Sequence, residues 1–193
     1  MDKREIRIAE MRVLPADNND MIVEGYAIVF DQPTVLYEYD GVQYKEVIAR
    51  GALDGADMRD VPFKYNHSDN IMVMARTRNK TLSLTVDDKG LFIRANLAPT
   101  TAGKDLYTLI DRRDIDKMSF SFTVQTDSYD RATHTRTIQK FKRIYDVAAV
   151  DMPAYDQTSI SARSYFDTQR EAEARAAAEL AARKKRLIIA TYF

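Results

Sequence analysis

Hydrophobic and polar residues alternate along roughly the first 150 positions, with the period of two that is typical of β-strands. The pattern begins loosely at Ile6, and residues 21–30 (MIVEGYAIVF) form a β-branched and aromatic run that favours a strand. Further runs predict strands at residues 42–48, 117–126 and 143–151. Residues 81–97 contain two alternating runs around Asp87-Asp88-Lys89-Gly90, which predicts a β-hairpin with a positive φ available at Gly90.

Two short helices are expected within this β-rich region. Residues 101–113 repeat with a helical period, and either Thr100 or Thr101 can cap their start. Their apolar face consists of Leu106, Leu109 and Ile110. Residues 52–60 are a weaker candidate, because Gly55 interrupts them.

The C-terminal part differs in composition. From about Asp167 to Arg186 it is rich in Ala, Glu and Arg and contains no Gly or Pro, which predicts a helix with little apolar face. Oppositely charged side chains recur at i,i+4 spacing, as in Glu171–Arg175. We expect a folded domain over residues 1–166, of class α+β and mainly β, and a helical tail over residues 167–193.

Composition narrows the possible functions. The 193 residues include 45% hydrophobic and 30% charged residues, and 29 basic residues balance 29 acidic ones. This balance gives no support to a specific nucleic-acid partner or an anionic membrane surface. The chain has no cysteine, which excludes disulfides, thiolate nucleophiles and cysteine-based metal sites.

The chain also lacks the features of a membrane or secreted protein. Its charged start, MDKREIRIAEMRV, has no apolar stretch of a signal peptide, and no segment approaches the roughly 20 apolar residues that span a bilayer. We therefore expect a soluble protein that is made and used inside a cell.

Histidine is scarce enough to limit the possible catalytic bases to two residues. His134 lies in a polar stretch between two predicted strands, where an ordinary surface histidine is expected. His67 follows the run VPFKYN and precedes Ser68, so it should lie where a strand ends and presents a side chain to a cleft. Position alone leaves open whether His67 is catalytic.

A serine nucleophile requires such a base, and residues 117–126 offer two candidates. Ser119 and Ser121 share the polar face of this predicted strand, while Met118, Phe120 and Phe122 occupy its apolar face. The pattern does not choose between the two serines, and both can be ordinary strand residues.

A carboxylate could orient the imidazole. Asp146 and Asp151 lie in the largely apolar run RIYDVAAVDMPAY, where an acidic side chain needs a partner. That partner can be the histidine or, less specifically, Arg143. No spacing signature indicates a metal or cofactor site, so none is predicted.

Taken in order, several motifs resemble the caudovirus prohead serine protease family, the type found in HK97-like phages. The motifs are VEGYAIVFDQP (23–33), VIARGALD (47–54), VPFKYNHSDN (61–70), DDKGL (87–91), LAPTTAGKDLYTLI (97–110), DIDKMSFSF (114–122) and YDVAAVDMPAYDQT (145–158). The resemblance covers roughly residues 20–165. It implies that His67 and Ser119 match the catalytic histidine and serine, and that Asp146 stands where many members carry Glu. Ser121 departs from the family pattern, which usually has Gly there.

The resemblance also implies a fold and a function. The fold would be like that of herpesvirus assemblin, a β-barrel ringed by short helices. The protein would be a serine endopeptidase that cleaves the scaffold or delta segment of the major capsid protein, and no cofactor is expected. Self-association and self-cleavage are further implications. The site of action would be the immature prohead in the cytoplasm of the host bacterium.

Three alternatives stay open at this level. A non-catalytic capsid-assembly or scaffold protein on the same fold would not bring His67, Ser119 and Asp146 together. A metal-dependent hydrolase would be sensitive to chelators. The tail, with its basic cluster Arg183–Arg186, could dock onto scaffold, be removed by self-cleavage, or be a solvated helix without a specific role.

Overall fold

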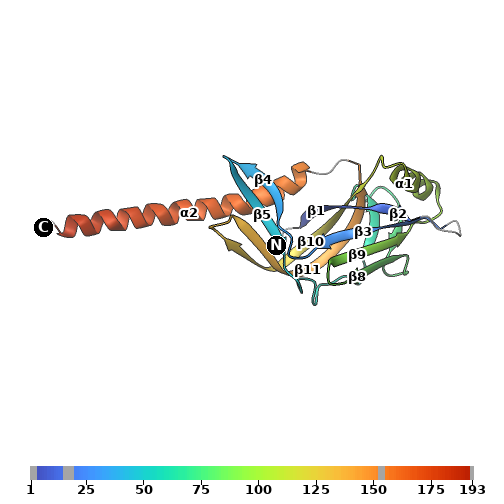
Figure 1. The fold of residues 1–193 in the computed structure, drawn as a ribbon, viewed down its shortest axis with the longest axis horizontal. Coiled ribbons are helices and arrows are strands. Elements are labelled where there is room, and N and C mark those ends of the chain that lie inside the picture. The colour runs from blue at the N-terminus through green and yellow to red at the C-terminus, as the bar shows by residue number, and fades with distance from the viewer. Residues whose placement is uncertain (1–3, 15–19, 152–154, 192–193) are drawn as a thin grey trace.

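The computed structural model describes residues 4–14, 20–151 and 155–191, with side chains left out of the description at 155–162 and 188–191. It is mainly β, as the sequence predicts, and the described residues form two helices (Figure 1). The strands are β1 (Glu5–Glu10), β2 (Arg12–Leu14), β3 (Ile22–Val29), β4 (Thr34–Tyr39), β5 (Val42–Ile48), β6 (Pro62–Tyr65), β7 (Ala75–Arg76), β8 (Leu82–Val86), β9 (Gly90–Asn96), β10 (Lys117–Asp130) and β11 (Thr135–Val150). The helices are α1 (Thr101–Asp111) and α2 (Tyr155–Thr191).

The strands form two sheets. One has seven strands in the order β1-β10-β11-β5-β4, with β6 and β7 branching from β11, and the other has four in the order β2-β3-β9-β8. The chain crosses from the first sheet to the second at Met11, between β1 and β2. Among the described residues the edge strands of the two sheets do not pair with each other, so the closed barrel expected from the resemblance is not formed.

The apolar faces of both sheets enclose one main core. Met118, Phe120 and Phe122 of β10 all point into it and are almost completely buried, as the alternation predicts. The rings of Phe120 and Phe122 are stacked at 5.1 Å, and Phe141 of β11 meets Phe122 edge-on at 5.0 Å. Val23 of β3 contributes from the second sheet.

Helix α1 matches the prediction closely. Thr100 is its N-cap, and its hydroxyl accepts a hydrogen bond from the Gly103 amide at 3.1 Å. Leu106 and Ile110 are buried, whereas Leu109 is exposed. The helix expected at residues 52–60 is wrong, because the chain there forms turns and a short bridge to β11 instead.

The predicted β8–β9 hairpin is present, but its glycine has a different role from the one expected. Gly90 does not have a positive φ. It is required by close packing, because a Cβ at this position would lie 1.9 Å from the carbonyl oxygen of Ile28. The turn is stabilised by the Asp87 carboxylate, which accepts from the amides of Lys89 and Gly90.

A buried ionic network joins β1 to β5, β10 and β11. Arg7 donates to Glu46 through two nitrogens, each at 2.6 Å, and to Glu5 at 2.9 Å. Arg136 donates to Glu5 and Glu46 as well, and to Asp127 at 2.5 Å. Burial opposes ionisation of Glu5, but the hydrogen bond from Arg136 and the charges of both arginines lower its pKa. The network holds edge strand β1 against the centre of the sheet.

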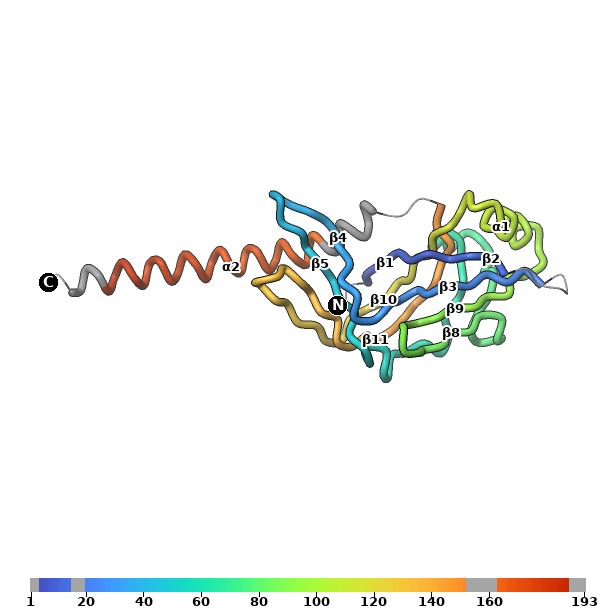
Figure 2. The backbone as a smooth tube through the Cα atoms, viewed as in Figure 1, coloured from blue at the N-terminus to red at the C-terminus, as the bar shows by residue number. Residues whose placement is uncertain are grey.

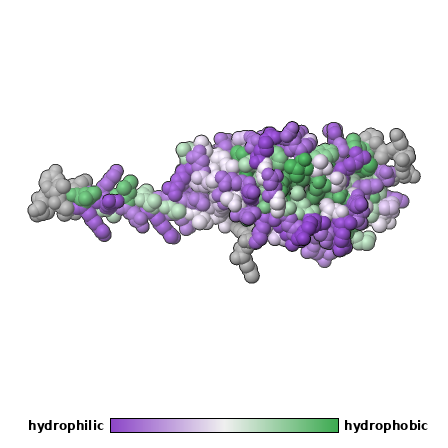
Figure 3. Space-filling view, turned by 90° about the horizontal axis from the view of Figure 1, so that it is seen from below, coloured by the Kyte–Doolittle hydropathy of each residue, from purple (hydrophilic) through white to green (hydrophobic). Residues whose placement is uncertain are grey.

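Helix α2 begins at Tyr155, earlier than the expected start near Asp167, and extends away from the sheets as a long arm (Figures 1 and 2). It lies against β1 and β4, and its Tyr165 and Phe166 pack on tyrosines of β4, β5 and β10. We call this cluster the aromatic seat, and define it as Tyr37, Tyr44, Tyr129, Tyr165 and Phe166. Beyond residue 173 its described side chains are exposed, and they are mostly hydrophilic with scattered apolar residues (Figure 3).

Candidate active site

The long β10–β11 hairpin places Ser119 and Asp146 on one face of the first sheet. Ser119 lies opposite Ala148, and Ser121 lies opposite Asp146. Residues directly opposite each other in an antiparallel pair point to the same face, so the serines and Asp146 share the face opposite the Phe120 core. This face is covered too, and Ser119 is 0% exposed.

His67 reaches these residues from a turn at the end of β6. Strand β6 runs parallel to β11, with Tyr65 beside Ala149, so the turn begins level with the Ser119 region. The Ser68 amide donates to the Tyr65 carbonyl at 3.0 Å, and both central residues have positive φ, 51° at Asn66 and 52° at His67. These values are those of a type I′ turn. The strand exit predicted for His67 is therefore correct.

The three residues form one hydrogen-bonded chain. The His67 Nε2 atom lies 2.8 Å from Ser119 Oγ, and the His67 Nδ1 atom bonds to Asp146 Oδ1. The Asp146 side chain is buried, whereas the His67 side chain is 18% exposed, so the chain of bonds meets solvent at the imidazole. With Nδ1 protonated and donating to Asp146, Nε2 is left free to accept the Ser119 proton.

The sequence left two choices open, Ser119 or Ser121 and Asp146 or Asp151, and the members of each pair have different contacts. Ser119 contacts His67, whereas the Ser121 hydroxyl has no hydrogen-bond partner among the described residues. Asp146 contacts the imidazole, whereas Asp151 accepts from the Tyr65 hydroxyl at 2.6 Å and the Asn66 amide at 2.9 Å. Donation to Asp151 raises the pKa of Tyr65.

Asp151 has a role that the sequence reasoning missed. Its backbone amide donates to the Asn66 side-chain oxygen at 3.2 Å, so Asn66 and Asp151 clamp each other in both directions. The clamp ties the turn that carries His67 to the end of β11. The dipeptide Asn66-His67 was a usable signal, because Asn tolerates positive φ better than most residues.

His134 lies at the far end of the β10–β11 hairpin, away from this site. The turn expected around it is present, but the side chain is half-buried rather than freely exposed. It hydrogen-bonds to the Tyr129 hydroxyl at 3.0 Å and packs against the Tyr44 ring. Arg143, the other partner considered for Asp146, contacts Asp57 at 3.9 Å.

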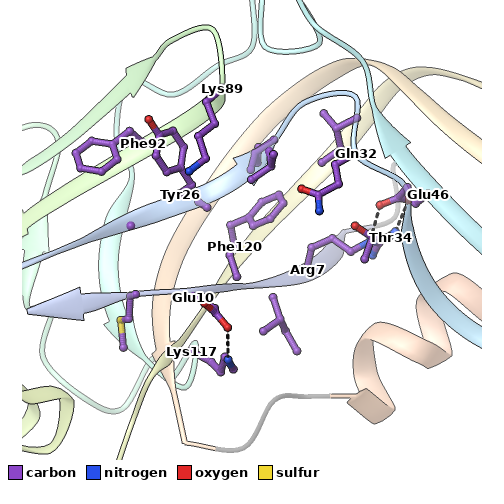
Figure 4. A pocket seen from close by; sticks show the side chains of 18 of the residues that line it. Arg7, Glu10, Tyr26, Gln32, Thr34, Glu46, Lys89, Phe92, Lys117 and Phe120 are labelled. Atoms are coloured by element: carbon purple, nitrogen blue, oxygen red, sulfur yellow. Dashed lines mark hydrogen bonds and ion pairs between the residues drawn. The ribbon is translucent and has the colours of Figure 1, made fainter. Parts of the chain in front are cut away.

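A groove of about 830 Å³ lies between β1 and β3, on the opposite side of β10 from Ser119 (Figure 4). Phe120 points into it, and Lys117 pairs with Glu10 at its rim. Because neighbouring residues of a strand face opposite ways, the groove is separated from Ser119 by the sheet itself. None of the three bonded residues lines it.

The described residues also bear on two other features, a metal site and a membrane-spanning helix. Within residues 4–14, 20–151 and 155–191, no three acidic or histidine side chains cluster in a way that could hold a metal ion. Over the same part of the chain, no helix has the length and apolar character needed to cross a membrane.

Comparison with known families identifies the chain's relatives. The model of the caudovirus prohead serine protease family matches residues 6–171, which is most of the chain. The chain belongs to this family. The family resemblance expected from the ordered motifs is therefore confirmed.

A curated relative within the prohead protease family is the prohead protease of Enterobacteria phage HK97. It is 28% identical over 155 residues, which cover 78% of this chain and 64% of the relative. The match thus spans somewhat less than two thirds of the HK97 protein. No solved structure matches the chain.

Proposed function

We propose that this prohead protease family member is a serine endopeptidase in which Ser119 is the nucleophile, His67 the general base and Asp146 the residue that orients the imidazole. The observation that supports this most directly is the bonded sequence Ser119–His67–Asp146, with 2.8 Å between the serine oxygen and the imidazole. A non-catalytic assembly protein on this fold predicts that the three residues are apart.

In the proposed mechanism, Ser119 Oγ attacks the carbonyl carbon of the scissile peptide bond and His67 Nε2 takes its proton. The resulting imidazolium is stabilised by Asp146 and returns the proton to the leaving amine as the peptide C–N bond breaks. A water molecule then attacks the acyl-enzyme, with His67 again acting as base, and Ser119 is regenerated. Backbone amides are expected to stabilise the oxyanion.

The proposed substrates are the scaffold or delta segment of the major capsid protein, and the chain itself, inside the immature prohead in a bacterial host. Membership of the prohead protease family and the printed name of the HK97 relative support this setting. We also propose that the fold is related to herpesvirus assemblin, with the two sheets as an open counterpart of its barrel. The division at residue 166 stays a prediction.

The nucleophile and base can be tested on the purified chain with a fluorescent alkyl fluorophosphonate. We expect a single adduct on Ser119, no adduct in Ser119→Ala, and labelling slowed by roughly 100-fold or more in His67→Ala. His134→Ala is the matched control, because it removes the only other histidine and should label like wild type. Equal labelling of wild type and His67→Ala would exclude His67 as the base.

The substrate can be tested by co-expression with the major capsid protein of the same phage. Wild type should shorten the capsid protein, and Ser119→Ala should leave it at full length. Persistent processing with Ser119→Ala would show that another nucleophile acts. The mass of the wild-type chain after incubation tests self-cleavage, since a product that keeps Phe193 argues against removal of the tail.

The non-catalytic alternative has one observation in its favour. Ser119 has no exposed surface, so a substrate reaches its hydroxyl only after a local rearrangement. The same labelling experiment distinguishes the two functions, because a protein that never exposes Ser119 forms no adduct even at long times. Insensitivity of labelling and processing to a chelator would remove the metal-dependent alternative.

A further inference from the structure

Ser121 is a buried hydroxyl without a hydrogen bond. Its residue is 1% exposed, and its Oγ atom has no partner among the described residues. Buried polar groups in native proteins are nearly always paired, and an exception calls for a physical explanation. A serine hydroxyl can donate one hydrogen bond, so the question is which acceptor lies within reach.

The cross-strand partner of Ser121 is Asp146, whose carboxylate is an acceptor. This carboxylate is buried, and among the described residues its hydrogen bond joins Oδ1 to the His67 imidazole. A buried ionised carboxylate is stable only when several donors surround it. Among the described residues no hydrogen bond reaches Asp146 Oδ2, and none is made by the Ser121 hydroxyl on the facing strand.

The strand register brings the two groups together. Ser121 is the cross-strand partner of Asp146, and opposite residues have Cβ atoms about 5 Å apart on the same face. The register shifts immediately after this pair, so that Phe122 lies opposite Ile144 and Tyr145 is the extra residue on β11. Bulges of this kind re-aim neighbouring side chains, and this one directly precedes Asp146.

We infer that Ser121 is a positioning residue that donates its hydroxyl hydrogen to Asp146 Oδ2, an inference that rests on the proposed function. Rotation about χ1 of Ser121 from one staggered position to another turns Oγ towards β11 without moving the backbone. The added bond fixes the carboxylate plane, and the carboxylate in turn fixes the imidazole that faces Ser119.

A hydrogen bond from Ser121 to Asp146 has an electrostatic effect that an apolar contact at the same position would not have. The hydroxyl hydrogen carries partial positive charge and points at the Asp146–His67 pair. It therefore stabilises the state with neutral imidazole and ionised Asp146 more than the state with imidazolium. Removing the hydroxyl should raise the pH at which His67 takes up a proton.

The other charged groups around the pair have their own contacts and are unchanged by a substitution at Ser121. Lys64 pairs with Asp69 at 2.5 Å, and Asp151 is bound by Tyr65 and Asn66. Arg4, just before β1, and Arg143 of β11 lie over the Tyr145 ring. A difference between wild type and Ser121→Ala therefore reports the hydroxyl.

The test compares wild type, Ser121→Ala and Thr123→Val. Thr123 is the matched control, because its hydroxyl is also buried and unpaired on β10 but lies opposite Arg143, not Asp146. The first readout is the rate of fluorophosphonate labelling against pH. In Ser121→Ala the acidic side of this pH–rate profile should move to higher pH by about half a pH unit, so that the labelling rate at a given acidic pH falls about threefold. Thr123→Val should follow wild type.

The second readout is the proton NMR titration of His67, which is simple to assign because His134 is the one other histidine. Ser121→Ala should raise the midpoint of the His67 titration by about half a pH unit, the same amount by which the labelling profile shifts. Ser121→Gly also removes the hydroxyl and should raise the His67 midpoint by the same amount. It replaces Ser121→Ala in the test if the alanine variant does not fold.

The outcomes separate the two proposals. An unchanged His67 midpoint in both Ser121 variants overturns the inference even if wild type is labelled on Ser119. An equal shift in Thr123→Val also overturns it, since the effect would then come from general loosening of β10. If wild type is never labelled, the proposed function fails, and the His67 titration still decides whether Ser121 acts on the Asp146–His67 pair.

Discussion

At the scale of single residues, the position of the imidazole depends on two consecutive residues with positive φ. Such a conformation is costly for residues other than Gly, and is tolerated best by Asn and Asp. Here Asn66 takes one of the two positions and His67 itself takes the other. The surrounding contacts must therefore hold the turn, and the clamp between Asn66 and Asp151 contributes two hydrogen bonds to this.

Substitutions at Asn66 should separate the backbone contribution from the clamp. Asn66→Gly keeps the positive φ but loses the side-chain bonds to Asp151, and should cost about 1 kcal/mol of unfolding free energy. Asn66→Ala loses both and should cost roughly 1 kcal/mol more. Denaturant unfolding measures the free energies, and the fluorophosphonate labelling rate should fall in the same order. Equal stability of the two variants would show that the backbone conformation is not what Asn66 supplies.

The sequence predicted these residues unevenly. His67 and Ser119 follow from the scarcity of histidine and the ordered motifs, and the structure brings them into contact. The pattern did not separate Ser121 from Ser119 or Asp151 from Asp146, because each pair has the same residue type and a similar setting. The distinction comes from strand register and from one bulge, which arise from pairing between segments far apart in the chain.

At the scale of elements, strands with regular alternation were predicted well and short ones were missed. The strand at residues 42–48 agrees in full with β5, whereas β2, β4 and β7 had no clear pattern. The expected helix at 52–60 failed because positive φ at Gly51 and Gly55 favours turns. Strand β1 shows a further limit, since its buried side chains at Glu5 and Arg7 are charged and its Ile residues are only partly buried.

The ionic network that explains this inverted pattern can be tested by a double-mutant cycle. Arg7→Met should cost about 3–5 kcal/mol, because it leaves Glu5 and Glu46 buried with one fewer cation. Combining it with Glu46→Leu should recover much of that loss, since the double variant replaces an ion pair by apolar groups. Denaturant unfolding provides the free energies. If the two losses simply add, Arg7 and Glu46 are not coupled.

At the scale of the whole molecule, the chain combines a packed body with an exposed arm. The body ends in the aromatic seat, where Phe166 is completely buried and touches the rings of Tyr37, Tyr44, Tyr129 and Tyr165. Burial raises the pKa of Tyr165 to about 12. Composition marked the change to a charged helix near residue 167, but gave no sign that the preceding turns of α2 are anchored by aromatic contacts.

The arm should therefore contribute little to folding, and the seat a great deal. Phe166→Ala removes a fully buried ring and should cost about 3–5 kcal/mol of unfolding free energy. Leu180→Ala is the matched control in the same helix, because Leu180 is 54% exposed, and it should change stability by less than about 0.5 kcal/mol. Denaturant unfolding of the full chain measures both. A large loss of stability in Leu180→Ala would mean that the arm packs in solution against either the body or a second copy of the chain. Repeating the measurement at two protein concentrations would distinguish these, because only association between copies depends on concentration.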